Sequence, residues 1–381
     1  MIITRTPLRI SFFGGGTDYP VWYREHGGAV LATTINKCCY ITCRRLPPFF
    51  EYHSRISYSK VENVDDNAAI EHPSVRGCLQ FLGIDDGIEI HHVADLPART
   101  GLGTSSAFTV GLLLALYALK NQMRDKQGLA ADAIHVEQEV LGEAVGAQDQ
   151  VSAAYGGFNR INFQNDVPIE VKRVLTAPNR LAELERHLAL YFTGFSRTAS
   201  EIAKEQIRMT PRRTKELEMM HQMVNEAEAI ISNPICPIAE FGKMLRESWQ
   251  LKRTLTQNIT NSSIDEIYDA GLSAGALGGK LLGAGGGGFM LFFVPPERRR
   301  ALRMRLQKLL CIPFTFSDRG SHVVVYEPEE VYDKSLADER GLVYGRSNGD
   351  GAQALSLARA SEATFGINRL KSNEQSRTIS S

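Results

Sequence analysis

The chain has 381 residues, and its 43 basic and 43 acidic side chains give a formal net charge of zero. A length of about two and a half average domains predicts two domains, and 43% apolar residues are enough to form a buried core. A neutral chain has no overall field that would attract nucleic acid or an anionic membrane, so we expect neither as a partner.

The first third of the chain has mostly the pattern of β-strands, in which apolar residues alternate or β-branched residues dominate. Strands are predicted at residues 8–13, 29–34, 39–44 and 88–93. Between Ser105 and Asn121 the period changes to that of a helix with apolar residues on nearly every face, which is typical of a buried helix. Helices at residues 130–141 and 147–155 and a strand at 158–163 follow.

A strand at residues 187–192 leads into a mainly helical region. Helices are predicted at residues 199–209, 211–232, 238–258, 264–276 and 297–310, and strands at 289–294 and 322–326. In the helix at 238–258, Phe241, Leu245 and Trp249 recur every four residues and form a core-facing stripe. We place a domain boundary near residue 195, which gives an α/β domain at 1–195 and a small α+β domain at 196–327.

The composition changes after residue 327. Residues 328–381 are poor in aromatic residues and rich in Ser, Ala, Asn and charged residues, which predicts a partly disordered tail. The N-terminal sequence lacks the features of a signal peptide, and no apolar run approaches the about 20 residues of a membrane span. The six cysteines lack zinc spacing and are too sparse for a disulfide framework, so we expect buried thiols in a soluble, cytoplasmic protein.

Many of the 33 glycines fall in three clusters instead of being scattered through turns. The clusters are Gly14-Gly15-Gly16, Gly101-Leu102-Gly103 and the run from Gly283 to Gly288. Glycine allows the backbone to approach a ligand closely or to adopt positive φ. Three such clusters in one chain predict a binding site.

The second cluster follows a predicted strand and opens the buried helix. Glycines followed by hydroxyl residues at a helix N-terminus offer free backbone N–H groups to a phosphate, so we expect an ATP phosphate loop formed by Gly101, Leu102, Gly103, Thr104, Ser105 and Ser106. No lysine follows as in a Walker loop, and Ser106 occupies the place of the third glycine in a dinucleotide fingerprint, which argues against a nicotinamide-dependent oxidoreductase. The alternative is a simple helix N-cap at Thr104 or Ser105.

Three motifs in this order resemble the GHMP kinases, the superfamily of galactokinase, homoserine kinase, mevalonate kinase and phosphomevalonate kinase. The motifs are Thr6 to Tyr19 (TPLRISFFGGGTDY), Pro97 to Ala107 (PARTGLGTSSA) and Lys280 to Phe289 (KLLGAGGGGF). The resemblance covers about residues 1–327. It implies an α+β fold with an N-terminal domain like domain 2 of ribosomal protein S5, a C-terminal ferredoxin-like domain, and a site for ATP and Mg²⁺ between them.

Within the superfamily the sequence resembles the D-glycero-D-manno-heptose 7-phosphate kinases. The resemblance rests on the glycine triplet before Thr17-Asp18-Tyr19, on residues 137–150 and on Thr193 to Arg197 (TGFSR). It implies transfer of the ATP γ-phosphoryl group to the anomeric C1 hydroxyl of heptose 7-phosphate. The product would be a 1,7-bisphosphate on the route to a GDP-activated heptose for capsule or surface polysaccharide.

The resemblance also implies roles for single residues. Ser105, or else Ser106, and Glu137 match the residues that hold Mg²⁺, while Glu139 should point to a different helix face. The alternative for Glu137 is an ordinary surface carboxylate. Asp149 matches the catalytic aspartate that accepts the proton of the attacking hydroxyl, and Arg9 matches the arginine that pairs with it and keeps it ionised. The alternative for Asp149 is a first-turn helix carboxylate.

The sugar site is implied in the same way. Asp18 matches an aspartate that binds sugar hydroxyls, and Gly15 and Gly16 stand where galactokinases carry Glu-His. Loss of those two side chains would open volume for a larger sugar, although glycine could equally serve the backbone. Gly285 and Gly286 of the third loop would close over the substrate, and we expect Lys280 beside them to be solvated.

The 7-phosphate requires a cationic or helix-terminal receptor. Our hypothesis is Ser196 and Arg197, just before the helix at 199–209, with Lys37, Arg44 and Arg45 as alternatives. Two other functions stay open: an L-fucose-type kinase of an unphosphorylated sugar, and a catalytically silent sugar or nucleotide sensor. We also leave open a homodimer.

Overall fold

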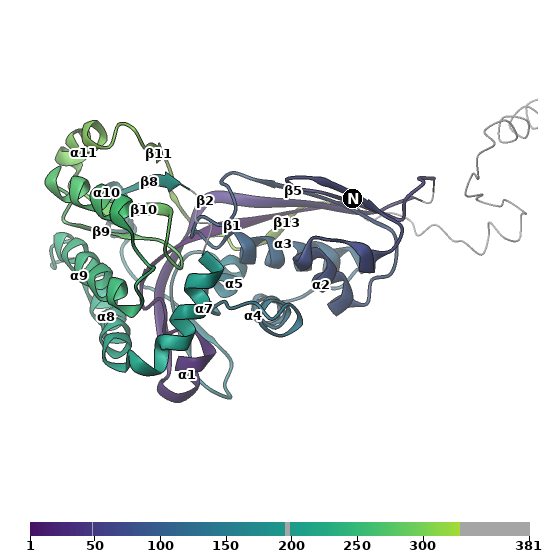
Figure 1. Ribbon diagram of the computed structural model, residues 1–381, viewed down its shortest axis with the longest axis horizontal. Coiled ribbons are helices and arrows are strands. Elements are labelled where there is room, and N and C mark those ends of the chain that lie inside the picture. Colours follow the sequence, from purple (N-terminus) through teal and green to yellow (C-terminus); the bar gives the residue numbers. More distant parts are fainter. Residues whose placement is uncertain (48, 195–198, 328–381) are drawn as a thin grey trace, which may run out of the picture. The chain divides into compact units, whose positions relative to one another are not determined.

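The computed structural model describes residues 1–47, 49–194 and 199–327, which are drawn as ribbon in Figure 1. Met1–Leu46 and the residues from Tyr52 to Glu327 belong to one compact unit. The predicted tail at 328–381 and the candidate residues Ser196 and Arg197 lie outside the described residues. Within these ranges, no helix combines the length and the apolar character needed to span a bilayer.

A large, mainly antiparallel sheet organises the first half of the chain. Its strands lie in the order β13-β1-β2-β5-β3-β4, with β6 and β12 also paired to β2, and β7 paired to β6. Their bounds are β1 Ile2–Phe13, β2 Gly28–Arg45, β3 Ser54–Ser57, β4 Val61–Val64, β5 Ile88–Ala94, β6 Phe158–Phe163, β7 Glu170–Arg173, β12 Phe316–Ser317 and β13 His322–Tyr326. Among the strands of the described residues, only β3 and β5 pair in parallel.

Helices cover one face of this sheet, as Figure 1 shows for α2, α3 and α5. The helices of this half are α1 Pro20–His26, α2 Pro73–Leu82, α3 Thr104–Leu119, α4 Lys126–His135, α5 Gln148–Tyr155 and α6 Pro178–His187. The central helix α3 is buried on all faces, as its all-round apolar pattern predicts. Gly111 permits this close packing, because a Cβ atom there would lie 2.6 Å from the Thr6 hydroxyl oxygen of β1.

A second, four-stranded antiparallel sheet has the order β11-β8-β10-β9. Its strands are β8 Leu188–Gly194, β9 Gly278–Leu281, β10 Gly288–Phe293 and β11 Leu310–Ile312. The helices of this half are α7 Ala199–Met209, α8 Thr214–Ser232, α9 Ala239–Leu255, α10 Ser262–Ser273 and α11 Arg299–Arg305. Helices separate β8 from β9 and β10 from β11, which is the β-α-β-β-α-β order of a ferredoxin-like domain.

The predicted stripe on α9 is buried at Phe241, Leu245 and Trp249. The Phe241 ring lies 5.4 Å from that of Phe12 and 5.1 Å from that of Phe13, edge to face, so α9 packs against the end of β1. This contact brings the helices of the second half to the strand that carries the first glycine cluster. Four of the six cysteines, Cys38, Cys39, Cys43 and Cys78, are buried, as expected.

Two strands pair across the domain boundary that the sequence predicts. Strand β8, assigned to 1–195, pairs with β10 and β11 of the second sheet. Strand β13, assigned to 196–327, pairs with β1 of the large sheet. The limits 1–195 and 196–327 therefore remain a prediction, because local sequence pattern shows where a strand is but not which strand it joins.

Candidate active site

The second and third glycine clusters contact each other through their backbones. A Cβ atom at Gly283 would lie 2.4 Å from the Gly101 Cα atom, and one at Gly288 would lie 2.3 Å from the Thr100 carbonyl oxygen. Gly101 and Gly283 also have φ angles of +84° and +77°, which side chains with a Cβ atom rarely adopt. Glycine is thus required at both positions, and the two loops form one continuous surface.

Arg9 and Asp149 meet beside these loops, as the sequence implies. The Arg9 guanidinium donates to both Asp149 carboxylate oxygens, at 2.7 Å and 2.6 Å, and its third nitrogen donates to the Gly101 carbonyl oxygen at 2.6 Å. Arg9 comes from the middle of β1 and Asp149 from the first turn of α5. The Asp149 side chain keeps 23% of its surface exposed, so it is held rigidly and remains accessible.

The N-terminus of α3 lies at the same place. Its cap residue is Gly103, at φ +71°, and no side chain caps the helix, so the N-cap role considered for Thr104 or Ser105 is not observed. A Cβ atom at Gly103 would lie 3.3 Å from the nearer Asp149 oxygen. The uncapped N–H groups at this helix end can donate hydrogen bonds to a phosphate. Because the Asp149 carboxylate is adjacent, the arrangement suits transfer of a phosphoryl group.

Asp18 is buried just after the first glycine cluster. It accepts hydrogen bonds from the Gly16 amide at 2.9 Å and from the Gln148 side-chain amide at 3.0 Å. Burial raises the pKa of Asp18, the hydrogen bond from Gly16 opposes this shift, and the nearby charge of Asp149 adds to it. Gly146 must be glycine, because a Cβ atom there would lie 1.9 Å from an Asp18 oxygen.

The two glycines before Thr17 differ in their surroundings. At Gly15 the nearest atoms to a Cβ position, on Gln148 and Ser11, lie 3.8 Å away, so some space is available. At Gly16 φ is +105°, and Gln206 lies 2.8 Å from the Cβ position. The expected open volume is therefore absent at Gly16, where glycine serves the backbone.

Glu137 occupies a short π-helical segment, Val136–Val140, that follows α4. One of its carboxylate oxygens accepts from the Ser106 hydroxyl at 2.8 Å and from the Gln150 side chain. The other, Oε1, is buried without a hydrogen-bond partner among the described residues. Burial raises the pKa of Glu137 to about 7, although the nearby hydroxyl groups of Thr109 and Ser106 oppose the shift.

These surroundings fit a hard cation, which would supply the partner that Glu137 Oε1 lacks. Of the two serines considered, Ser106 contacts Glu137, whereas Ser105 is exposed on the first turn of α3. Glu139 is exposed, so it points to a different face, as expected. The π-helical turn matters here, because such turns often place a side chain at a functional site.

Two buried lysines were missed by sequence reasoning. Lys280, expected to be solvated, is only 3% exposed and donates to the Phe12 carbonyl oxygen at 2.7 Å. Lys252 is 6% exposed and donates to the carbonyl oxygens of Leu281 and Gly283. A signal existed for Lys252, since it continues the buried stripe of α9 three residues after Trp249.

The third glycine loop is held by the segment that follows α9. The Gly286 amide donates to the Ile259 carbonyl oxygen at 3.0 Å, and a Cβ atom at Gly285 would lie 2.7 Å from Ile259 Cα. Both glycines therefore lie in the loop that contacts Gly101, and their role in covering the substrate stays a prediction.

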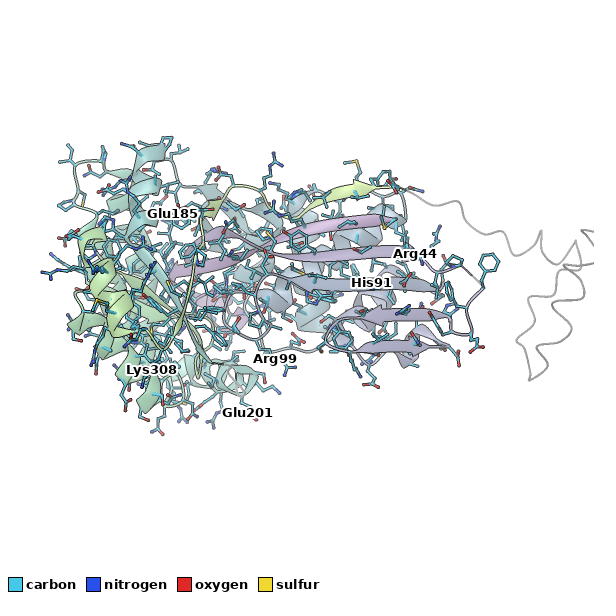
Figure 2. All side chains as sticks on the ribbon, turned by 90° about the horizontal axis from the view of Figure 1, so that it is seen from above. Arg44, His91, Arg99, Glu185, Glu201 and Lys308 are labelled. Carbon is cyan, nitrogen blue, oxygen red and sulfur yellow. The ribbon has the colours of Figure 1, made fainter. Side chains whose placement is uncertain are left out.

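Two of the alternatives for the sugar phosphate, Arg44 and Arg45, lie far from this site, and the third, Lys37, lies nearer. The first glycine cluster contacts Ala29 at the start of β2, and Arg44 lies 15 residues further along that strand, a span of about 50 Å. Arg44 is paired with Glu89 at 2.6 Å, and Figure 2 shows it toward one end of the strands. Lys37 lies nearer, because it is three residues, or about 10 Å, along β2 from Thr34, the residue that pairs with Arg9. Arg44 is therefore distant from a sugar bound at Asp149, whereas Lys37 stays an alternative.

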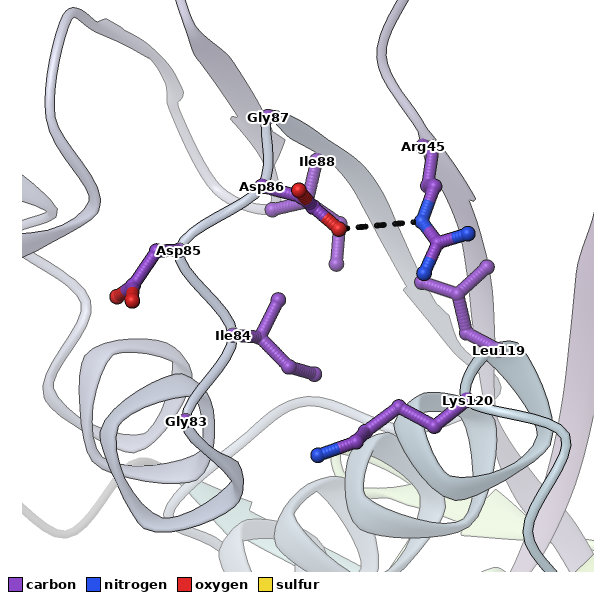
Figure 3. A pocket seen from close by; sticks show the side chains of 9 residues that line it. All are labelled: Arg45, Gly83, Ile84, Asp85, Asp86, Gly87, Ile88, Leu119 and Lys120. Atoms are coloured by element: carbon purple, nitrogen blue, oxygen red, sulfur yellow. Dashed lines mark ion pairs between the residues drawn. The ribbon is translucent and has the colours of Figure 1, made fainter. Parts of the chain in front are cut away.

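A cavity of about 230 Å³ next to Arg45 is also remote from the glycine loops. It is lined by Arg45, the 83–88 loop, Leu119 and Lys120 (Figure 3). Arg45 pairs with Asp86 at 3.3 Å, and Lys120 donates to the Leu82 carbonyl oxygen at 2.7 Å. Lys120 follows the C-terminal end of α3, about 24 Å from the N-terminal end that meets Asp149. Arg45 is therefore distant as well.

Comparisons with known proteins agree with this arrangement. The family model of the GHMP kinases N terminal domain matches residues 73–157, and that of the GHMP kinases C terminal domain matches residues 237–310. A D-glycero-alpha-D-manno-heptose 7-phosphate kinase of Campylobacter jejuni is 33% identical over 313 residues, which cover 74% of this chain and 86% of that protein. A bifunctional fucokinase/GDP-fucose pyrophosphorylase of Arabidopsis thaliana is 26% identical over 73% of this chain and 28% of its own length.

Among solved structures, a D-glycero-D-manno-heptose 1-phosphate kinase from Bacteroides thetaiotaomicron superimposes with a TM-score of 0.68 at 25% identity. The match covers 87% of this chain and 100% of that one. These findings confirm the two-domain α+β fold that the three motifs imply. The chain belongs to the GHMP kinase family of ATP-dependent kinases.

Proposed function

We propose that this kinase transfers the γ-phosphoryl group of ATP to the anomeric C1 hydroxyl of D-glycero-D-manno-heptose 7-phosphate. The products are heptose 1,7-bisphosphate, which serves GDP-heptose synthesis, and ADP. The observation that carries the proposal is the Arg9–Asp149 pair at the junction of the glycine loops. Similarity to the Campylobacter enzyme, at 33% identity, supports this substrate over other sugars.

Asp149 is the proposed catalytic base. As the C1 oxygen bonds to the γ-phosphorus and the bond to the β-phosphate oxygen breaks, the hydroxyl proton passes to the Asp149 carboxylate. Arg9 fixes both carboxylate oxygens by a two-point contact. An anomeric hydroxyl is more acidic than an ordinary alcohol, so a carboxylate suffices as base.

The phosphates of ATP are proposed to bind the loop from Gly101 to Ser106. Its N–H groups lie at the N-terminus of α3, where the helix dipole favours negative charge. Glu137, together with Ser105 or Ser106, would hold Mg²⁺. When bound, the ion neutralises charge on the phosphates.

The sugar is proposed to lie between Asp18 and the third loop. Asp18 would accept hydrogen bonds from sugar hydroxyls, Gly15 leaves room beside it, and Gly285 and Gly286 would cover the substrate. Ser196 and Arg197 remain our proposal for the 7-phosphate, and Lys37 is the alternative on β2 that lies nearest to Arg9. We keep a cytoplasmic location as part of the proposal and leave a homodimer open.

The test is an assay of ADP release with ATP and Mg²⁺. D-glycero-D-manno-heptose 7-phosphate is compared with the unphosphorylated heptose, L-fucose and galactose. We expect turnover with the phosphorylated heptose alone. Turnover with L-fucose instead would overturn the substrate proposed here. It would favour a kinase of unphosphorylated sugars, similar to the fucokinase of Arabidopsis thaliana. Failure to turn over any sugar would favour the sensor.

A further inference from the structure

Two ammonium groups are buried beside the Arg9–Asp149 pair without a carboxylate of their own. Lys252 and Lys280 form no ion pair in the part of the chain that the structure describes, and both donate to backbone carbonyl oxygens. Lysine is almost never fully buried unless it is paired, because removing an ammonium group from water is costly. The position of these two groups therefore calls for an explanation.

The neighbouring charges do not balance them. Asp149 is already neutralised by the two-point contact with Arg9. Asp18 is the carboxylate that attracts both lysines, while Arg9 repels both and Lys252 repels Lys280. Two cations thus share one carboxylate, and burial together with the repulsion from Arg9 lowers the pKa of Lys252 to about 8. A purely structural role would be served at lower cost by an apolar side chain.

The contacts of Lys252 show what it does. Its ammonium group donates to Leu281, the last residue of β9, and to Gly283 in the third glycine loop. Gly283 packs directly on Gly101, and the Gly101 carbonyl oxygen accepts from Arg9. A continuous series of contacts therefore leads from α9 through both loops to the guanidinium that holds Asp149.

We propose that Lys252 is a positioning residue for phosphoryl transfer: it holds the third glycine loop against the second and thereby fixes the Arg9–Asp149 pair. The inference rests on the proposed function, since it concerns the same site. Lys252 is 94% buried and its ammonium group donates to carbonyl oxygens next to and within the third glycine loop, so we infer that it acts through the loops. A misplacement of about 1 Å at a reacting group can reduce rate about 100-fold, which is why loop position matters here.

The experiment compares three variants of the full chain with the wild type. Lys252→Met removes the charge at similar volume, Lys252→Arg keeps it, and Lys243→Met is the control. Lys243 lies on the same helix but is exposed and pairs with Glu240 at 2.8 Å. We measure kcat and the KM for each substrate by ADP release, the melting temperature, and amide hydrogen exchange of residues 283–288 without substrates.

We expect Lys252→Met to lower kcat at least about tenfold, with KM for ATP changed less than about threefold. Its melting temperature should not fall, and its loop amides should exchange faster. Lys252→Arg should recover a substantial part of kcat, and Lys243→Met should match the wild type. Retention of more than half of kcat in Lys252→Met, or unchanged exchange of the loop, would overturn the inference.

The exchange measurement needs no substrate, so the two proposals can fail separately. If the wild type does not phosphorylate the heptose phosphate, the proposed substrate is wrong. In that case, faster amide exchange of residues 283–288 in Lys252→Met would still support the proposal that Lys252 holds the third glycine loop in place. If the wild type is active and both kcat and exchange are unchanged in Lys252→Met, only the inference about Lys252 is wrong.

Discussion

At the scale of single residues, Asp149 is the group on which the proposed chemistry depends most directly. Asp149→Asn keeps the shape and one hydrogen bond from Arg9 but removes the base. We expect kcat to fall about 10²- to 10⁴-fold, with the Kd for ATP nearly unchanged, because the phosphates bind the loop at 101–106. Steady-state kinetics and nucleotide titration test this.

The matched control for Asp149→Asn is Asp125→Asn. Asp125 caps α4 by accepting from the Gly128 amide at 2.8 Å, and asparagine caps a helix equally well. The control should therefore keep wild-type activity and stability. An Asp149→Asn variant that retained half of the wild-type kcat would remove Asp149 from the mechanism.

Glu137 should control the response to Mg²⁺. Glu137→Gln removes the charge from the buried carboxylate whose second oxygen lacks a partner. We expect the Mg²⁺ concentration for half-maximal rate to rise at least about tenfold. Glu139 is exposed and lies four residues after the end of α4, so Glu139→Gln should leave the Mg²⁺ response unchanged. Equal Mg²⁺ curves for the two variants would contradict the assignment of Glu137 to the metal.

Lys252 should also affect how the free energy of unfolding depends on pH. Its pKa is lowered from 10.5 to about 8 by burial and by Arg9, against attraction from Asp18, with Lys280 close by. Between pH 8 and pH 10.5 the unfolded chain binds more protons than the folded chain, so the free energy of unfolding rises with pH in this range. Below about pH 8 the buried Lys252 ammonium group destabilises the folded state to its full extent. The shift corresponds to on the order of 3 kcal/mol.

The comparison of Lys252→Met with the wild type isolates this effect, because other groups titrate in both proteins. We expect the stability advantage of Lys252→Met to be largest at pH 7 and to shrink as pH approaches 10.5. Urea unfolding at several pH values measures it, with Lys243→Met as a flat reference. A difference that stayed constant over this range would mean that Lys252 is not a buried, titrating ammonium group in solution.

Residues of the site differ in how far sequence reveals them. Arg9, Asp18 and Asp149 could be identified because they belong to ordered motifs, and the structure brings Arg9 and Asp149 into contact. Lys280 was misjudged, because a lysine beside a glycine run looks solvated until tertiary packing buries it. The choice between Ser105 and Ser106 likewise depended on helix orientation, which a single sequence does not give.

At the scale of elements, the close contact between two glycine loops gives a direct test. A Cβ atom at Gly283 would collide with Gly101, so Gly283→Ala should force the loops apart. We expect kcat to fall at least about tenfold. Gly83→Ala is the control, since Gly83 has a similar φ of +60° and nothing within 4 Å of its Cβ position.

Both substitutions place alanine in a left-handed backbone conformation, which costs about 1 kcal/mol. If Gly283→Ala and Gly83→Ala have similar melting temperatures, a loss of rate in Gly283→Ala alone is not due to this strain. Kinetics of the two variants, measured side by side, provide the test. Full activity of Gly283→Ala would contradict the view that the second and third loops act as one surface.

Most helices were predicted from the sequence, but α1, α2 and α6 were not, and one predicted helix differs in an instructive way. The all-round apolar pattern identified α3, and the four-residue spacing identified the buried face of α9. The helix expected at residues 130–141 instead ends at His135 and continues as the π-helical turn that carries Glu137. A π-helical turn changes one hydrogen-bond register without changing composition, so periodicity does not detect it.

At the scale of the whole molecule, the pairing of strands that are distant in the chain could not be predicted from the sequence. Strand β8 joins the second sheet and β13 returns to β1, although the chain order suggested otherwise. These pairings matter for function, because β8 and β10 support the third loop while β1 carries Arg9 and the first glycine cluster. The site is therefore assembled from both halves of the chain.

The position of the new phosphate tests the central claim most directly. Wild-type enzyme is incubated with ATP, Mg²⁺ and D-glycero-D-manno-heptose 7-phosphate, and the product is examined by ³¹P and ¹H NMR. We predict two phosphate resonances from the sugar, one of them coupled to the anomeric proton, which identifies a 1,7-bisphosphate. A new phosphate on any other carbon, or no transfer to the heptose phosphate, would contradict the account.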